Sequence, residues 1–288
     1  MELLLTLICV LVAIILLYAA YNGKQFFMQV DVLCCTIFGL VAIVLPGLAS
    51  KLETKKPDDV VVHMVRASGC VLIASAYVFN QVQHSADATV RVVLMVSRLV
   101  TCTLVAAGGL FQRSRSSSST DYSLMFIYFN VAFAVIYIYF LLTSREWGGH
   151  TQLDTKVNLH LRIDFFATLV FGIFFYAFPE WLLSAQVGIK ITRLQEYSSM
   201  LFGAFMIGSS IVSSYAPGFI DEENQRAQFQ GRIMQNIFLL LAMIYTQFST
   251  SSWTVYHVYF GISGCFLWTF NAIGGLASPR EIDEVKSM

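Results

Sequence analysis

The chain has 288 residues with no net charge; 57% of them are hydrophobic and only 12% are charged. Soluble domains are about 25% charged, so a soluble fold of this size could not bury so much apolar surface, and the excess must face lipid. The balanced charge also removes any electrostatic basis for nucleic-acid binding. The composition therefore predicts an integral membrane protein with little mass outside the bilayer.

The first apolar run, Leu3 to Tyr21, is long enough for a spanning helix, which needs about 20 residues. Only Glu2 precedes it among charged residues, so the basic stretch that opens a secretory signal peptide is missing. We therefore expect residues 1–30 to form a retained N-terminal anchor helix and a loop.

Eight further apolar runs follow, joined by short segments rich in charge, Gly, Pro and Ser. The runs are continuously apolar, whereas strands of a membrane barrel alternate apolar and polar residues. The sequence thus predicts an all-α, polytopic helical bundle of about nine transmembrane helices. The eight runs cover residues 31–50, 61–82, 90–111, 121–143, 162–184, 197–218, 232–249 and 253–275.

An ordered series of residues recurs along the chain. At an offset of 133, Asp31, Phe38-Gly39 and Pro46 recur as Asp164, Phe171-Gly172 and Pro179. At 134, Gly69, Ser75 and Arg98 recur as Gly203, Ser209 and Arg232, and at 131, Tyr128-Phe129 recurs as Tyr259-Phe260. Small changes of offset are what insertions in loops produce, so we predict an internal duplication.

The duplication defines two four-helix repeats, residues 31–146 and 162–288 with a short C-terminal tail, separated by a linker at 147–161. An even number of helices returns the chain to the same side of the membrane. The repeats are therefore expected to share one orientation, related by an axis along the membrane normal.

Charged residues inside a bilayer are costly and are candidates for function. Asp31 and Asp164 open the first helix of each repeat, and Arg98 and Arg232 lie near the start of the third, at similar depth. We expect Asp31 to pair with Arg98, or with Arg91 on a similar helical face, and Asp164 to pair with Arg232. Two interpretations stay open: a brace between helices, or a site for a lipid headgroup or an ion.

Small residues and prolines are the other repeated feature. Gly39, Gly172, Gly69 and Gly203 allow close approach of helices. Pro46 and Pro179 kink or end their helices. A kink opens room for a lipid in a lateral cavity, whereas simple termination near the interface does not.

No catalytic motif occurs in a usable context, and the five histidines do not cluster at metal-ligand spacing. His63 and His257 are interpreted as polar residues on helix faces. All six cysteines lie in apolar runs, where they are expected to be unpaired packing residues. The sequence predicts no enzyme, no metal site and no cofactor.

The segment Arg113-Ser114-Arg115-Ser116-Ser117-Ser118-Ser119 resembles a substrate of basic-directed kinases, which act in the cytosol, with Ser114, Ser116 and Ser117 as acceptors. A flexible polar linker is the alternative. Basic residues divide seven against six between the two sides, so the positive-inside rule does not decide the orientation. The kinase interpretation places the N-terminus in the cytosol. The membrane is expected to be that of the endoplasmic reticulum or the plasma membrane.

The function expected from these features is that of a non-enzymatic accessory subunit of a larger membrane assembly, whose partners are membrane lipids and another membrane protein. A role in lipid handling or lipid transfer follows by exclusion. The alternative is a small transporter or channel with a site at the repeat interface. A subunit needs an apolar outer groove, whereas a transporter needs a polar path near the midplane.

Overall fold

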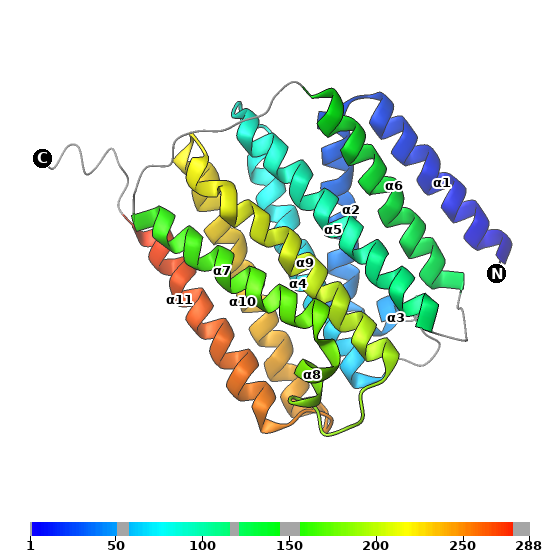
Figure 1. Cartoon of the computed structure of the whole chain (residues 1–288), viewed down its shortest axis with the longest axis vertical. Coiled ribbons are helices and arrows are strands. Elements are labelled where there is room, and N and C mark those ends of the chain that lie inside the picture. Colours follow the sequence, from blue (N-terminus) through cyan, green and yellow to red (C-terminus); the bar gives the residue numbers. More distant parts are fainter. Residues whose placement is uncertain (1, 51–57, 116–120, 145–155, 279–288) are drawn as a thin grey trace, which may run out of the picture.

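The computed structural model describes residues 2–50, 58–115, 121–144 and 156–278, and these residues are helical almost throughout (Figure 1). Within them, the one β feature is an isolated antiparallel bridge between Val187 and Trp253. The all-α prediction is confirmed. In chain order the helices are α1 (Glu2–Tyr21), α2 (Lys24–Val44), α3 (Pro46–Ser50), α4 (Asp59–Val82), α5 (Ala88–Arg115), α6 (Asp121–Thr143), α7 (Lys156–Ala177), α8 (Pro179–Ser184), α9 (Arg193–Tyr215), the 3₁₀ turn η1 (Ala216–Gly218), α10 (Glu222–Ser249), the π-helical segment η2 (His257–Ile262) and α11 (Ser263–Ala277).

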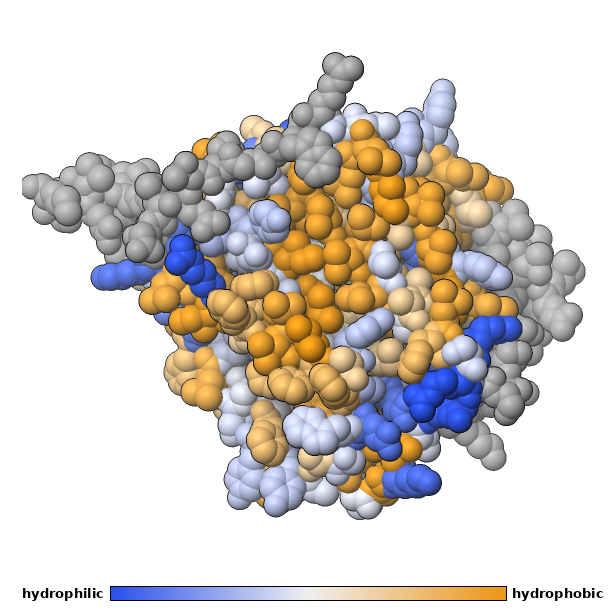
Figure 2. Space-filling view, viewed as in Figure 1, coloured by the Kyte–Doolittle hydropathy of each residue, from blue (hydrophilic) through white to orange (hydrophobic). Residues whose placement is uncertain are grey.

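Seven helical segments of the described chain are long and apolar enough to cross a membrane. They lie in α2, α4, α5, α6, α7, α9 with η1, and η2 with α11. Apolar side chains cover the middle of the face in Figure 2, and hydrophilic ones gather toward the ends of the helices. These features indicate an integral membrane protein. The expected count of nine adds α1 and α10 to this set.

The helices pack in a pattern that pairs the two halves of the chain. α2 packs on α4, and α7 packs on α9. The third helix of each half packs on the second helix of the other half: α5 packs on α9, and α10 packs on α4. Since α4 and α9 also contact one another, these two helices form the centre of the bundle (Figure 1).

Three helices begin earlier than the hydropathy predicts. α2 starts at Lys24 and not at 31, directly after Gly23, whose φ of 96° stops α1 from continuing. α7 starts at Lys156 and not at 162, so residues 156–161 belong to the helix and not to the linker. α10 starts at Glu222, where Asp221 accepts a hydrogen bond from the Glu223 amide at 3.0 Å. Hydropathy detects only the apolar part of a helix, and each of these helices extends past it with polar residues in its first turn.

The two repeated prolines interrupt their helices in the same way. Pro46 follows Leu45 (φ −124°, ψ 52°) and Pro179 follows Phe178 (φ −128°, ψ 45°). A proline has no N–H and disfavours helical geometry in the residue before it. The predicted single runs 31–50 and 162–184 are therefore each two helices, α2 with α3 and α7 with α8.

The repeated glycines lie where the first and second helices of each half cross. A Cβ on Gly69 would lie 2.9 Å from the Gly39 carbonyl oxygen, and one on Gly203 would lie 2.7 Å from that of Gly172. The Gly203 Cβ would also lie 2.6 Å from the backbone nitrogen of Tyr176. Because these contacts are with backbone atoms, they cannot be relieved by a side-chain rotation.

Gly203→Ala is therefore expected to lower the melting temperature in detergent, by a loss of about 1–3 kcal/mol for overpacking. Gly264→Ala is the matched control, because its Cβ would meet only Phe171 Cζ at 3.8 Å. It should leave the stability unchanged or slightly higher, since Ala favours a helix over Gly by about 1 kcal/mol. Equal melting temperatures for the two variants would contradict the close packing at Gly203.

Candidate functional site

Two buried ion pairs join the first helix of each half to its third helix. Arg98 Nε and Nη2 lie 2.7 and 2.8 Å from the two carboxylate oxygens of Asp31. Arg232 Nε and Nη2 lie 2.8 and 3.1 Å from those of Asp164. The aspartates are 1% and 0% exposed, so both pairs are removed from solvent and lipid. At 1.5 Å per residue, the four groups lie roughly 10–15 Å from the starts of their helices.

Each aspartate also accepts a hydrogen bond from an aromatic residue of the fourth helix. The Tyr137 hydroxyl donates to Asp31 Oδ2, and Trp268 Nε1 donates to Asp164 Oδ1 at 2.6 Å. Sequence reasoning missed both residues. The signal was present, because the offset of 131 that relates Tyr128 to Tyr259 also relates Tyr137 to Trp268.

The second ion pair lies in a wider polar network than the first. Ser213 Oγ donates to Asp164 Oδ2 at 2.5 Å, and Gln228 Nε2 donates to that same serine at 2.7 Å. Arg232 further donates to Gln235 Oε1 at 2.7 Å and to Ser209 Oγ at 3.2 Å. Its guanidinium carbon lies 4.5 Å from the centroid of the Trp268 ring.

The first half has apolar residues at two of the four hydroxyl and amide positions of that network, whereas Ser75 and Thr101 correspond to Ser209 and Gln235. An offset of 134 pairs Ser213 with Phe79 and Gln228 with Leu94. Near Asp31 the further contact is the Cys35 thiol, at 3.7 Å from Oδ1. Within the described chain the first pair thus has fewer polar neighbours than the second, which is embedded among hydroxyl and amide groups.

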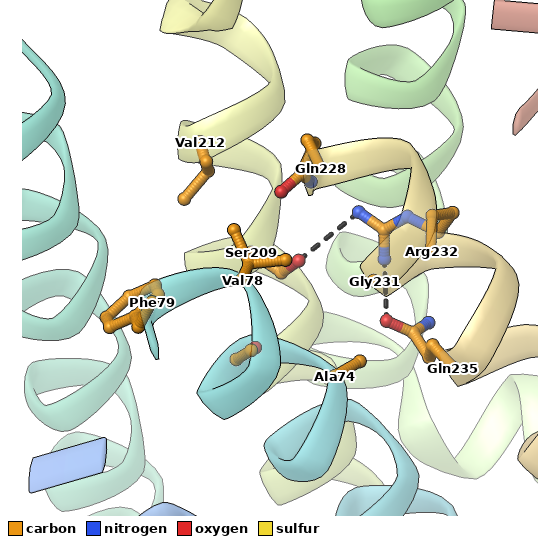
Figure 3. A pocket seen from close by; sticks show the side chains of 10 residues that line it. Ala74, Val78, Phe79, Ser209, Val212, Gln228, Gly231, Arg232 and Gln235 are labelled. Carbon is orange, nitrogen blue, oxygen red and sulfur yellow. Dashed lines mark hydrogen bonds between the residues drawn. The ribbon is translucent and has the colours of Figure 1, made fainter. Parts of the chain in front are cut away.

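A small cavity lies beside the second network, between α4, α9 and α10 (Figure 3). Figure 3 shows Gln228, Arg232 and Gln235 reaching toward it from α10, with Ser209 facing them from α9. Its volume is about 10 Å³, which is the size needed for a single water molecule. The centre of the bundle at this point has room for a water and not for a larger solute.

A second cavity, of about 130 Å³, is lined mostly by the C-terminal half, with His63, Met64 and Ala67 contributed by α4, and is almost wholly apolar. Its walls come from α4, α7, α8, α9, α10, η2 and α11 and from the connecting segments that carry Gln186 and Trp253, and none of its lining residues is charged. Phe171 of α7 (40% exposed) and Phe260 of η2 (62% exposed) belong to the lining, so the wall of the cavity reaches the outer surface of the bundle at these two side chains. Trp268 lines it as well and connects it to the second ion pair.

One end of the apolar cavity carries three polar rings. The centroids of His63 and His257 lie 5.1 Å apart, and that of Trp253 lies 4.7 Å from the first and 4.2 Å from the second. His63 Nδ1 lies 2.9 Å from Thr246 Oγ1. His63 of α4 and His257 of η2, interpreted from the sequence as polar residues on helix faces, are both buried and lie in contact. Their separation of 194 positions carries no local spacing signal.

The other residues singled out from the sequence lie apart from these features. Arg98, and not Arg91, makes the contact with Asp31; Arg91 Nη1 donates to the Ser85 carbonyl oxygen at 2.6 Å. Ser114 lies in the last turn of α5 and donates to the Phe111 carbonyl oxygen at 2.7 Å. Ser116 and Ser117 lie outside the described residues. Within the described chain, five cysteines are free: Cys34, Cys35, Cys70, Cys102 and Cys265. In that same part of the chain, no cluster of His, Cys, Asp and Glu has the form of a metal site.

The second ion pair predicts strong coupling between its members. Asp164→Ala should lower the free energy of unfolding in detergent by about 3–5 kcal/mol, because it leaves the Arg232 charge buried without its counterion. Adding Arg232→Ala in that background should cost little more. A double-mutant cycle of melting temperatures measures this coupling.

The control for that cycle is the ion pair between Arg115 and Glu196, which spans 3.5 Å and leaves the Arg115 side chain 46% exposed. Removal of either member of such a pair should cost less than about 1 kcal/mol. Additive losses at Asp164 and Arg232 would show that these two residues act separately.

Comparison with known proteins places this architecture in a family. A family model described as a domain of unknown function (DUF8292) matches residues 29–277, which span most of α2 and all of α3 to α11. Comparison with curated proteins and with solved structures gives no match. On the extent of that match, the chain belongs to the DUF8292 family.

Proposed function

We propose that this chain is a non-enzymatic, multi-pass membrane protein that binds a membrane lipid in the lateral apolar cavity of its C-terminal half. It acts there as an accessory subunit of a larger membrane assembly that handles lipid. The observation that carries the proposal is the cavity itself: about 130 Å³, uncharged, and with a wall that reaches the outer surface of the bundle at Phe171 and Phe260.

The position of the opening supports a ligand that comes from the bilayer. α7 has much of its apolar surface exposed, including Phe166 (62%) and Leu159 (57%), and α11 exposes Leu267 (72%) and Phe270 (67%). A mouth between two lipid-facing helices admits an acyl chain directly from the surrounding hydrocarbon. A cavity that enclosed 150 Å³ of apolar space in another protein held benzene, so the space here suits part of a chain.

The alternative of a transporter or channel rests on the polar cavity between α4, α9 and α10, which occupies the repeat interface. Arg232, Gln228 and Gln235 give that cavity a polar lining suited to an ion or small solute. Its volume, about 10 Å³, favours a structural water over a transported solute. The lipid-binding proposal therefore ranks first.

The same proposal includes an internal duplication with nine membrane-spanning helices. Matched contacts in α2–α6 and α7–α11 support it: an Asp–Arg pair, an aromatic donor to the aspartate, a helix broken at Pro and a glycine crossing. The reciprocal packing of α5 on α9 and of α10 on α4 is what an approximate two-fold axis between α4 and α9 produces. Such an axis would lie along the membrane normal, with α1 as a separate anchor and the N-terminus in the cytosol.

The accessory-subunit part of the proposal rests on the exposed apolar helix faces and on short connections. A second membrane protein would pack on one of these faces, in the endoplasmic reticulum or plasma membrane. Purification in a mild detergent, followed by mass spectrometry, should recover a stoichiometric membrane-protein partner. Recovery of the chain alone in several mild detergents would contradict the accessory-subunit proposal. The lipid-binding proposal would then be tested separately.

The lipid site is tested by native mass spectrometry of the chain released from phosphatidylcholine nanodiscs. The wild type should retain a bound lipid, and Gly264→Leu should lose it, because Gly264 lines the cavity and a leucine there would fill it. Gly264→Ala should retain the lipid. Equal retention by the wild type and the leucine variant, with both folded, would overturn the proposal; uptake of a solute into proteoliposomes would favour the transporter.

A further inference from the structure

Two buried polar groups at the end of the apolar cavity have no hydrogen-bond partner within the described chain: Trp253 Nε1 and His257 Nε2. Their side chains are only 6% and 2% exposed, and both line the cavity. Native proteins rarely leave buried polar groups unsatisfied, so such a pair calls for an explanation. A bound molecule that supplies the missing partners is one such explanation.

The local fold holds these two groups in place. Backbone hydrogen bonds from Thr254 N to Gln186 O (2.9 Å) and from Gly188 N to Ser252 O (3.1 Å) fix the segment that carries Trp253 against the segment after α8. η2 then turns His257 toward Trp253 with ring centroids 4.2 Å apart. π-helical segments of this kind are often found at functional sites.

The hydrogen-bond partner of His257 defines which nitrogen carries the proton. Nδ1 lies 3.2 Å from Gln247 Oε1, and an amide oxygen can only accept, so Nδ1 donates. In the neutral imidazole the other nitrogen, Nε2, then offers a lone pair. The cavity thus presents one donor, the Trp253 N–H, beside one acceptor, His257 Nε2.

These two groups select among lipid headgroups. A hydroxyl can accept from the indole N–H and donate to the imidazole nitrogen, so it satisfies both. An ester or ketone oxygen can satisfy only the tryptophan. Phosphate, carboxylate and ammonium groups would bring a charge into a cavity with no charged lining residue, which is unfavourable.

We infer that the cavity binds an uncharged long-chain lipid by its free hydroxyl, which accepts a hydrogen bond from Trp253 Nε1 and donates one to His257 Nε2. This inference rests on the proposed lipid site and specifies its ligand. The hydroxyl end lies beside Trp253, His257 and His63, and the chain runs past Gly264 and leaves between Phe171 and Phe260. A flexible chain fits a volume of about 130 Å³ with its remainder in the bilayer.

The test uses the full chain in phosphatidylcholine nanodiscs and a long-chain alcohol that carries a photoreactive diazirine and an alkyne tag. Crosslinked peptides are identified by mass spectrometry, and labelling is competed with unlabelled 1-dodecanol, dodecyl methyl ether and dodecane. Labelling should fall on the peptides that contain Phe171 or Phe260. Dodecanol should compete about tenfold better than the ether, which can accept but not donate.

Trp253→Phe keeps an aromatic ring but removes the N–H together with the five-membered part of the indole. The lost packing affects the alcohol and dodecane alike, so the lost donor should weaken the alcohol about tenfold more than it weakens dodecane. Trp181→Phe is the matched control, because Trp181 lies on α8 and is 64% exposed, and it should behave as the wild type. If the alcohol, the ether and the alkane compete equally, and Gly264→Leu still abolishes labelling, the hydroxyl inference is overturned and the lipid site stands. Labelling that Gly264→Leu does not change would defeat the lipid site itself, and competition by cholesterol in preference to dodecanol would overturn the assignment of a flexible chain.

Discussion

The architecture depends on the requirement that a charge inside a low-dielectric bundle be neutralised at once by a partner. Asp31 and Asp164 lie two turns inside their helices, where an unpaired carboxylate would be very costly. In each aspartate, both carboxylate oxygens accept hydrogen bonds from the guanidinium group of an arginine on the third helix. An aromatic residue of the fourth helix donates a further hydrogen bond. Three helices of each half are thereby fixed in register at one depth, and the glycine crossings of the first and second helices complete the packing.

Much of this could be predicted from the sequence because the signals were repeated. The apolar runs predicted the helices, and the helix order placed Asp31 at a depth similar to that of Arg98, and Asp164 at a depth similar to that of Arg232. The starts of α2, α7 and α10 could not be predicted from hydropathy, because their first turns contain polar residues and lie outside the apolar runs. The cavity with His63, Trp253 and His257 was also beyond reach, since it is formed by tertiary packing of helices from both halves and no spacing along the chain encodes it.

The two halves share a framework but differ in what surrounds it. Phe79 and Leu94 fill the first half at the positions where Ser213 and Gln228 build a polar network in the second. The second half also carries η2, where Gly261 allows approach to α10: a Cβ there would lie 2.8 Å from Met243 Sδ. Trp268 belongs to the ion-pair network and to the cavity lining at once, so a ligand in the cavity would touch a residue that holds Asp164. Under the proposed lipid-binding function, the first half would act as a scaffold and the second would supply most of the binding residues.

The exchange of third helices between the halves has a consequence for how the chain is made. During synthesis α5 enters the bilayer long before α9, on which it packs. In the same way, α4 is inserted before α10, which packs on it. In that interval the ion pair between α2 and α5 can already form, because both of its members belong to the first half. The newly inserted first half is therefore held together by its charges while one face of α4 and one face of α5 remain open to lipid or to an insertion chaperone. Arrival of the second half closes those faces, so a nascent chain truncated after α6 would carry a correct ion pair and an unfinished surface, the state in which quality-control factors of the membrane would meet it.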